Sequence, residues 1–307
     1  MAGQVICVVG AANIDLISYV PHLPRMGETL HGTGFRMGYG GKGANQAVMA
    51  AKLGAEVSMV AKLGQDVFGE GTLANFREWN VDTANVSFTH EAFSGVAPIA
   101  VDPDGRNVII IVTGANDLLS VEDVERARST IAAAAVLVCQ LEIPLEITLA
   151  ALRLAREERV TTIFNPAPAR RELPDELYRL SDVLCPNESE TELLVGRPVS
   201  TDEEARTAAG ELLERGAGAV ILTLGDRGCL VVTLEAEKYV PVERVQAVDT
   251  TGAGDAFVGS LAYFLASGRG LVEAAERANR IAAMSVQGRG TQTSFPTADV
   301  VPIGILD

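Results

Sequence analysis

The residues most able to do chemistry lie in the segment DTTGAGD (249–255), which is followed by the apolar, helix-like stretch AFVGSLAYFLA. Glycines at a helix start leave backbone N–H groups without partners, and those groups together with the helix dipole bind negative charge. Asp255 would stand in the first turn beside this anion hole. A carboxylate there would repel a bound phosphate unless it had another task, such as accepting a proton from an attacking hydroxyl. The segment is therefore typical of an enzyme that transfers a phosphoryl group. The alternative interpretation is that Asp255 only stabilises the first turn of the helix.

A second glycine-rich segment, GYGGKG (38–43), precedes another helical pattern. Its spelling matches the dinucleotide-binding motif GxGxxG, but that motif should directly follow the first strand and this segment lies well beyond it. It also differs from a P-loop, because Arg36 stands where the first glycine belongs and Gly43 replaces the required Ser or Thr. The segment therefore indicates a helix entry at which Lys42 and Asn45 can donate hydrogen bonds to a polyol, or at which Lys42 is simply solvated.

Polar residues recur at the ends of the predicted strands. The carboxyl ends of the strands in an open parallel sheet converge on the ligand crevice, so we expect the following residues to lie near one another: Asn13, Asp15, Glu142, Asn165, Asn187, Glu190, Thr223 and Gly225. Asn13, Asp15 and Glu142 supply acceptors and a donor for sugar hydroxyls. Asn187 and Glu190 have the oxygen chemistry to orient magnesium-bound water. Each of these residues taken alone is equally explained as a loop cap.

The elements that must position these residues alternate between short apolar runs and helical patterns. The predicted strands are 5–9, 57–63, 136–141, 160–164, 183–185 and 219–224, and the predicted helices are about 44–53, 68–79, 145–158, 188–195 and 202–215. Strands separated by helices require right-handed crossovers, which gives an α/β fold with a central, mostly parallel sheet flanked by helices. Capping boxes are predicted for Ser120 with Asp123 and for Thr201 with Glu204.

Two stretches without a helical pattern, about 16–38 and 86–112, contain strand-like pieces and the turn DPDG (102–105). We expect them to form a small antiparallel sheet inserted into the main fold as a β-lid over the ligand crevice. No internal repeat or low-complexity linker interrupts the sequence. Residues 1–307 are therefore predicted to form a single domain that carries a lid.

Composition excludes several classes of function. The 25 Lys and Arg against 40 Asp and Glu give a net charge of −15, which argues against nucleic-acid binding but not against small anions held by backbone amides. The longest apolar run, Ile131–Cys139, is far shorter than the ~20 residues that span a bilayer, so no membrane span is expected. The lack of a basic segment before Val5–Val9 makes a signal peptide unexpected.

The cysteines and histidines show no pattern that binds a metal. Cysteine pairs of the CxxC type are absent, and the four cysteines are expected to be buried thiols in a reducing compartment: Cys7, Cys139, Cys185 and Cys229. The three histidines lie in or beside the lid stretches, where surface positions are expected: His22, His31 and His90. No GxSxG motif supports a serine hydrolase.

The two glycine-rich segments, extended to GYGGKGANQ (38–46) and AVDTTGAGDAFVG (247–259), resemble the signatures of the PfkB-type carbohydrate kinases, the ribokinase-like family. The likeness continues in order along nearly the whole chain through CQLEIP (139–144), FNPAPA (164–169), CPNESE (185–190), LTLGDRG (222–228) and SVQGRGTQTS (285–294). This resemblance implies the family fold, a helix-flanked sheet with a β-lid that also forms a homodimer contact. It further implies ATP-dependent phosphorylation of D-ribose at its 5-hydroxyl, in the cytoplasm (with nuclear entry in a eukaryote).

The resemblance also implies roles for individual residues. Asp255 would be the catalytic base, with the amides of Gly252, Ala253 and Gly254 as the anion hole. The sugar would be held by Asn13, Asp15, Gly41, Lys42, Gly43, Ala44, Asn45, Glu142 and Asp255. ATP would contact Asn187, Thr223, Leu224, Gly225, Asp226, Arg227, Gly228, Gly254, Asp255 and Asn279. Mg²⁺ would accompany the phosphates, with Glu190 acting through water, and an activating K⁺ would lie near Asp249, Thr251, Ser285, Gly288, Gly290 and Ser294.

Other functions stay open at this point. A kinase of the same fold could accept a different sugar, a sugar acid or a nucleoside; stacking of a nucleoside base would need aromatic residues near the lid, for which Phe35 and Tyr39 are the candidates. A regulator that binds sugar or nucleotide without catalysis is a second alternative, and the intact Asp255 and glycine segment argue against it. A nicotinamide-dependent dehydrogenase is disfavoured by the position of GYGGKG (38–43).

Overall fold

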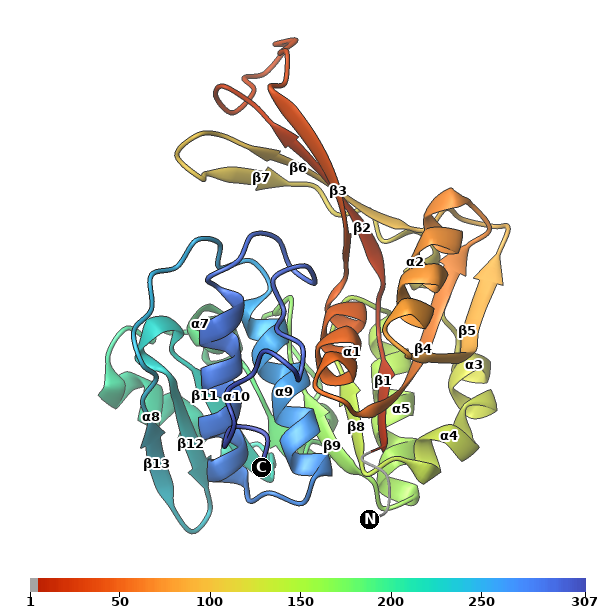
Figure 1. The fold of residues 1–307 in the computed structure, drawn as a ribbon. Helices are drawn as coiled ribbons and strands as arrows, with labels where there is room; N and C mark the ends of the chain where they lie inside the picture. Colours follow the sequence, from red (N-terminus) through yellow and green to blue (C-terminus); the bar gives the residue numbers. More distant parts are fainter. Residues whose placement is uncertain (1–4) are drawn as a thin grey trace.

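A nine-stranded sheet forms the centre of the computed structural model, which describes residues 5–307 (Figure 1). Its order is β13-β12-β11-β10-β9-β8-β1-β4-β5. The strands are β1 (Val5–Val9), β4 (Glu56–Gly64), β5 (Asp82–Thr89), β8 (Val136–Cys139), β9 (Thr161–Phe164), β10 (Val183–Leu184), β11 (Ala219–Thr223), β12 (Cys229–Thr233) and β13 (Glu237–Val240). All neighbouring pairs from β5 to β11 are parallel, and only β12 and β13 are added antiparallel. The predicted α/β class with a mostly parallel sheet is therefore confirmed.

Helices cover both faces of this sheet, which explains why its strands are nearly continuous apolar runs. Alternate residues of β1 serve the two faces: Ile6 and Val8 pack into one core cluster, whereas Cys7 and Val9 pack into the other. The first cluster contains residues of α1 (Lys42–Lys52), α2 (Val67–Glu78), α9 (Ala253–Ala266) and α10 (Leu271–Ser285). The second contains residues of α3 (Val121–Arg126), α4 (Arg128–Ala133), α5 (Leu145–Glu157), α6 (Asp175–Arg179), α7 (Glu188–Val195) and α8 (Asp202–Glu214).

Local signals in the sequence account for several helix starts. Both predicted capping boxes are present, at Ser120 with Asp123 and at Thr201 with Glu204. A third, at Asn187 with Glu190, begins α7 and was not predicted. The four cysteines are buried and unpaired, as expected.

A second sheet projects beyond the body formed by the large sheet and its helices, and corresponds to the predicted lid (Figure 1). Its order is β3-β2-β6-β7, with strands β2 (Asn13–Tyr19), β3 (Gly34–Gly40), β6 (Gly95–Val101) and β7 (Asn107–Ile109). The outer pairs are antiparallel, and the central pair β2/β6 is parallel. The turn at 102–105 joins β6 to β7, with the Gly105 amide donating to the Asp102 carbonyl (3.0 Å).

One boundary of the predicted lid was wrong. Residues 86–89 do not belong to the lid, because they lie in β5, which pairs in parallel with β4 at the edge of the large sheet. The crossover helix α2 precedes β5, so these residues complete a β-α-β unit. A half-buried edge strand with no helix directly after it resembles a lid strand in sequence, and that explains the error.

No helix among residues 5–307 is long and apolar enough to cross a membrane. The prediction about a signal peptide depends on residues 1–4, which lie outside the described residues.

Candidate active site

The ends of the parallel strands and the starts of α1 and α9 enclose a polar pocket of about 160 Å³. Its lining residues come from both glycine-rich segments and from three strand ends: Lys42, Asn165, Cys185, Asn187, Glu190, Thr223, Thr250, Gly252, Ala253, Gly254, Asp255 and Val258. The structure thus brings together polar residues that are far apart in the sequence, as the parallel topology requires.

Asp255 lies in the first turn of α9, and its side chain is held from two directions. Oδ2 accepts a hydrogen bond from Asn45 Nδ2 (2.9 Å), and Oδ1 accepts one from Gln46 Nε2 (2.9 Å). Asp255 is only 7% exposed, yet it lines the pocket. The carboxylate is therefore fixed by α1 while remaining accessible to a small ligand.

The start of α9 has the geometry of an anion site. Gly252, its N-cap residue, has a φ of +81° and no side-chain hydrogen bond caps the helix. Apart from its chain neighbours and the backbone of its own helix, no heavy atom among the described residues lies within 4 Å of the place where a Cβ on Gly254 would stand. The Ala253 amide already donates to the Thr250 carbonyl (3.2 Å). Gly252 and Gly254 are thus better placed than Ala253 to offer an amide to a ligand.

Acidic side chains surround Lys42 at the start of α1. The pKa of Lys42 is raised, chiefly by the charge of Asp255 and also by Glu142 and Glu190, which outweigh the effect of burial. Burial raises the pKa of Glu142 and of Glu190. Burial, with added repulsion from Glu142 and Asp255, raises the pKa of Asp15 to about 6. Negative charge exceeds positive charge at this site, which favours binding of a cation together with any phosphate.

The predicted sugar-binding residues gather at the base of the lid. Glu142 accepts a hydrogen bond from the Lys42 amide (2.8 Å), and Asn13 accepts one from Asn116 Nδ2 (2.8 Å). Gly40 on β3 leaves room for Asp15, since a Cβ there would lie 2.5 Å from its Oδ1. Asn116, which is 1% exposed, was missed, because the short 3₁₀ helix that carries it (Gly114–Leu118) gives no periodic signal.

Packing accounts for two residues of the predicted sugar set. A Cβ on Gly43 would lie 2.8 Å from the Gly10 backbone, so the glycine permits the close contact between α1 and the end of β1. Ala44 donates its amide to the Ala11 carbonyl (3.0 Å), and its side chain lies in the core.

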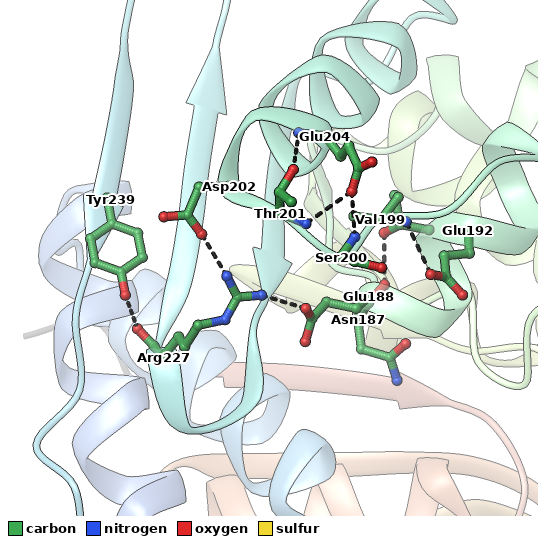
Figure 2. A network of polar contacts seen from close by, with 11 residues as sticks. Asn187, Glu188, Glu192, Val199, Ser200, Thr201, Asp202, Glu204, Arg227 and Tyr239 are labelled. Atoms are coloured by element: carbon green, nitrogen blue, oxygen red, sulfur yellow. Dashed lines mark hydrogen bonds and ion pairs between the residues drawn. The ribbon is translucent and has the colours of Figure 1, made fainter.

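The turn between β11 and β12, predicted to bind ATP, is anchored to neighbouring helices through its own residue Arg227 (Figure 2). Its guanidinium pairs with Glu188 at the start of α7 and with Asp202 at the start of α8, and its carbonyl accepts a hydrogen bond from the Tyr239 hydroxyl. Gly225 has a φ of +59° with open space around it. Arg227 therefore holds the turn against α7, α8 and β13, and Gly225 leaves backbone accessible.

Two other residues of the predicted nucleotide set already have intramolecular roles. Asn279 donates from Nδ2 to the Val240 carbonyl (3.1 Å), which links α10 to β13. Asn187 Oδ1 accepts from the Glu190 amide (2.7 Å) and Glu190 Oε2 accepts from the Asn187 amide (2.9 Å), so both residues cap α7 in addition to lining the pocket.

The predicted cation-binding residues meet where the loop before α9 contacts the loop after α10. Asp249 accepts hydrogen bonds from the amides of Thr251 (3.0 Å) and Gly290 (2.9 Å). Burial would raise the pKa of Asp249, but these amides outweigh it and lower that pKa below its ordinary value. Gly288 lies against Ser294, because a Cβ on Gly288 would stand 3.0 Å from the Cβ of Ser294. Carboxylate, hydroxyl and carbonyl oxygens of this kind suit a hard cation.

Comparisons with known proteins show which family the chain resembles. Residues 4–298 match the model of the pfkB family carbohydrate kinases. A mouse protein named ribokinase is 47% identical over 98% of this chain and 94% of its own length, and a Salmonella typhi protein named deoxyribokinase is 42% identical over 96% of each. The structure of an Arabidopsis thaliana ribokinase complexed with ribose and ATP superposes with a TM-score of 0.89 at 30% identity, covering 100% of this chain and 99% of that one.

Proposed function

The chain belongs to the pfkB family of carbohydrate kinases, and from this premise we propose that it transfers the γ-phosphoryl group of ATP to the 5-hydroxyl of D-ribose. The products are D-ribose 5-phosphate and ADP. One observation carries the proposal: the Asp255 carboxylate stands in the first turn of α9 beside the open backbone at Gly254, held by Asn45 and Gln46. The proposed substrate class, a pentose sugar, is supported by relatives named ribokinase that match this chain over nearly its full length.

In the proposed reaction, Asp255 accepts the proton of the 5-hydroxyl as the hydroxyl oxygen attacks the γ-phosphorus. The bond from that phosphorus to the β,γ-bridging oxygen breaks, and ADP leaves. Backbone amides at the start of α9, chiefly those of Gly252 and Gly254, stabilise the charge on the transferring group. Alignment and charge stabilisation supply most of the rate, because phosphoryl transfer asks little covalent chemistry of the protein.

Sugar recognition is proposed for the residues at the base of the lid. Asn13, Asp15 and Glu142 accept hydrogen bonds from sugar hydroxyls, while Lys42, Asn45 and the Gly41 backbone complete the site. Burial raises the pKa of Asp15, the charges of Glu142 and Asp255 raise it further, and this supports the role. A partly buried acid cluster of this kind is unfavourable unless a ligand with several hydroxyl donors binds to it.

Two cations are proposed to act with these residues. Mg²⁺ would be held through water by Glu190 and, when bound, would neutralise the phosphates; the excess of carboxylates around Lys42 fits this. K⁺ would be held by oxygens of the cluster around Asp249 and Ser294, which contacts the loop that leads into α9. Asp249 would then order the backbone that precedes the anion hole.

We also propose a homodimer formed through the lid. The lid carries large exposed apolar side chains on β3, on β7 and just beyond it: Phe35, Met37, Val108, Ile109, Ile110 and Ile111. Unpaired apolar strands favour aggregation unless they are covered. A stable monomer in sedimentation at micromolar concentration would contradict the dimer. The cytoplasmic location stays a prediction.

The decisive experiment compares acceptors with ATP, each with and without K⁺. We expect the highest kcat/KM with D-ribose, and a lower rate when K⁺ is replaced by a bulky organic cation. The deoxyribokinase relative makes 2-deoxy-D-ribose the second candidate acceptor. Fructose, 2-keto-3-deoxygluconate and adenosine serve as comparisons. A higher kcat/KM with any of these acceptors would contradict D-ribose as the substrate. A rate that does not change when the monovalent cation is exchanged would contradict the role of K⁺.

A further inference from the structure

A chain of buried side-chain amides leads from the Asp255 carboxylate to the loop after α10. Asn45 donates from Nδ2 to Asp255 Oδ2 (2.9 Å), and Gln292 donates from Nε2 to Asn45 Oδ1 (3.0 Å). Asn75 on α2 donates from Nδ2 to Gln292 Oε1 (2.9 Å). The side chains of Asn45, Asn75 and Gln292 are buried. The backbone carbonyl of Gln292 also accepts a hydrogen bond from Lys52 Nζ (2.6 Å). Each amide in this first arm directs its N–H group toward Asp255.

A second arm reaches the other oxygen of the same carboxylate. Gln46 donates from Nε2 to Asp255 Oδ1 (2.9 Å) and to Asn165 Oδ1 (3.1 Å). Gln140 donates from Nε2 to Gln46 Oε1 (2.6 Å). Gln46 and Gln140 are each 1% exposed, and neither lines the pocket. The second arm therefore has the same polarity as the first.

This shared polarity has a physical cause. A side-chain amide has one donor end and one acceptor end, whereas a carboxylate only accepts, so Asp255 determines which way every amide in both arms must face. The orientation leaves Gln140 Oε1 without a hydrogen-bond partner among residues 5–307, and the Gly10 backbone packs beside that oxygen. A buried polar atom without a partner is unfavourable for folding, which indicates that the arrangement serves the site.

We propose that Gln46 and Gln292 are positioning residues for phosphoryl transfer, which together hold both oxygens of Asp255 in one orientation toward the attacking hydroxyl. Gln46 acts directly, and Gln292 acts through Asn45. The inference rests on the proposed role of Asp255 as the base. Orientation of this kind matters because a displacement of about 1 Å at a reacting group costs about 10²-fold in rate.

The test reverses the polarity of an arm without changing its length. In Gln292→Glu, the new carboxylate can only accept, so Asn45 must turn its amide to donate to it and would then present Oδ1 to Asp255. Two acceptors would face each other, and the base would move. Gln292→Met keeps the length but removes the polar group, so Asn45 stays free to face Asp255. Gln46→Glu and Gln46→Met repeat this comparison on the second arm, and Gln65→Glu, an exposed position, controls for added charge.

For each full-length variant, kcat, the KM of both substrates and the dissociation constant of ADP are measured, together with the unfolding midpoint. We expect each Glu variant to lower kcat about 10–100-fold while ADP affinity stays within about threefold. Each Met variant should lose less kcat than its Glu partner, and Gln65→Glu should match the unchanged protein. If Gln292→Glu does not fold, the Gln46 pair decides.

Equal kcat in the Glu and Met variants of both positions would overturn the proposal, because it would show that only packing matters. Unchanged kcat in all of them would overturn it as well. Asp255→Asn is assayed alongside: full activity in that variant defeats the role of Asp255 itself, whereas loss of activity there with unaltered Gln variants defeats only the positioning role.

Discussion

Helices α1 and α9 begin in the same way but for different reasons. Each starts after a glycine with positive φ, Gly41 at +86° and Gly252 at +81°, and neither has a side-chain cap. At α1 the space is filled by the protein, since a Cβ on Gly41 or Gly43 would lie 2.8 Å from backbone atoms of the segment after β1. At α9 a Cβ on Gly252 would lie 2.4 Å from the Thr291 side chain, but the space beside Gly254 is open. The α1 glycines thus serve packing, whereas Gly254 in the first turn of α9 leaves space for a ligand.

The two starts nevertheless depend on each other. A Cβ on Gly259 of α9 would lie 2.5 Å from the Gln46 carbonyl of α1, so the helices are in close contact. This contact places Asn45 and Gln46 against Asp255. The start of α1, which is tightly packed, therefore orients Asp255 at the start of α9.

We expect the largest effect on catalysis from removing Asp255, the acid at the start of α9. Asp255→Asn keeps the shape of the side chain but removes the base, so we expect kcat to fall about 10²–10⁴-fold. Calorimetric titration with ADP should show affinity close to that of the unchanged protein, because the amides of α9 remain. Lys42→Met, at the filled start, should weaken substrate binding more than it lowers kcat. If Lys42→Met lost more kcat than Asp255→Asn, the assignment of chemistry to α9 would be wrong.

Matched glycine substitutions test the contrast directly. Gly43→Ala should lower the free energy of unfolding by about 1–3 kcal/mol, because the added methyl meets backbone atoms of Gly10 and Ala11 that cannot move aside. Gly254→Ala should leave that free energy unchanged or raise it by up to ~1 kcal/mol, since alanine favours a helix more than glycine does. Its kcat/KM for ATP should nonetheless fall about tenfold or more, as the methyl occupies the ligand space. Urea unfolding and steady-state kinetics on both variants give the comparison.

The opposite result would remove the distinction between the two starts. A destabilised Gly254→Ala protein with normal kinetics would mean that α9 needs this glycine for folding. A stable Gly43→Ala protein would mean that α1 tolerates more volume than its contacts indicate.

Sequence alone predicts the parallel core and both glycine-rich helix starts, because apolar periodicity and glycine spacing are local signals. It misplaces 86–89, because membership of a sheet depends on a pairing partner distant in sequence, here β4. It also misses Gln46, Gln292 and Asn116, whose importance arises only from contacts across the fold. Gln46 did carry one signal, because with Asn45 it forms a polar pair directly before the apolar run AVMAA (47–51) of α1.

The smallest expected effect concerns the acid cluster next to the filled start. The pKa of Asp15 is raised from 3.8 to about 6, chiefly by burial and then by Glu142 and Asp255. A carboxyl whose pKa is higher in the folded than in the unfolded state supports folding fully below the unfolded value, and this support is lost as pH rises through about 6. Asp15→Asn removes the charge and should therefore stabilise the ligand-free protein by about 1–2 kcal/mol near pH 7.5, with no gain near pH 4.

The same substitution should also weaken sugar binding, so stability and function move in opposite directions at Asp15. In the unchanged protein, the KM for the sugar should rise about tenfold for each pH unit below about 6, as the carboxylate that accepts the sugar hydroxyl becomes protonated. Asp299→Asn, at an exposed position, should change neither quantity. The stability difference between Asp15→Asn and the unchanged protein should vary with pH. If it did not, the folded state would not raise the pKa of Asp15. In that case the folded protein would accommodate Asp15 beside Glu142 and Asp255 without a ligand.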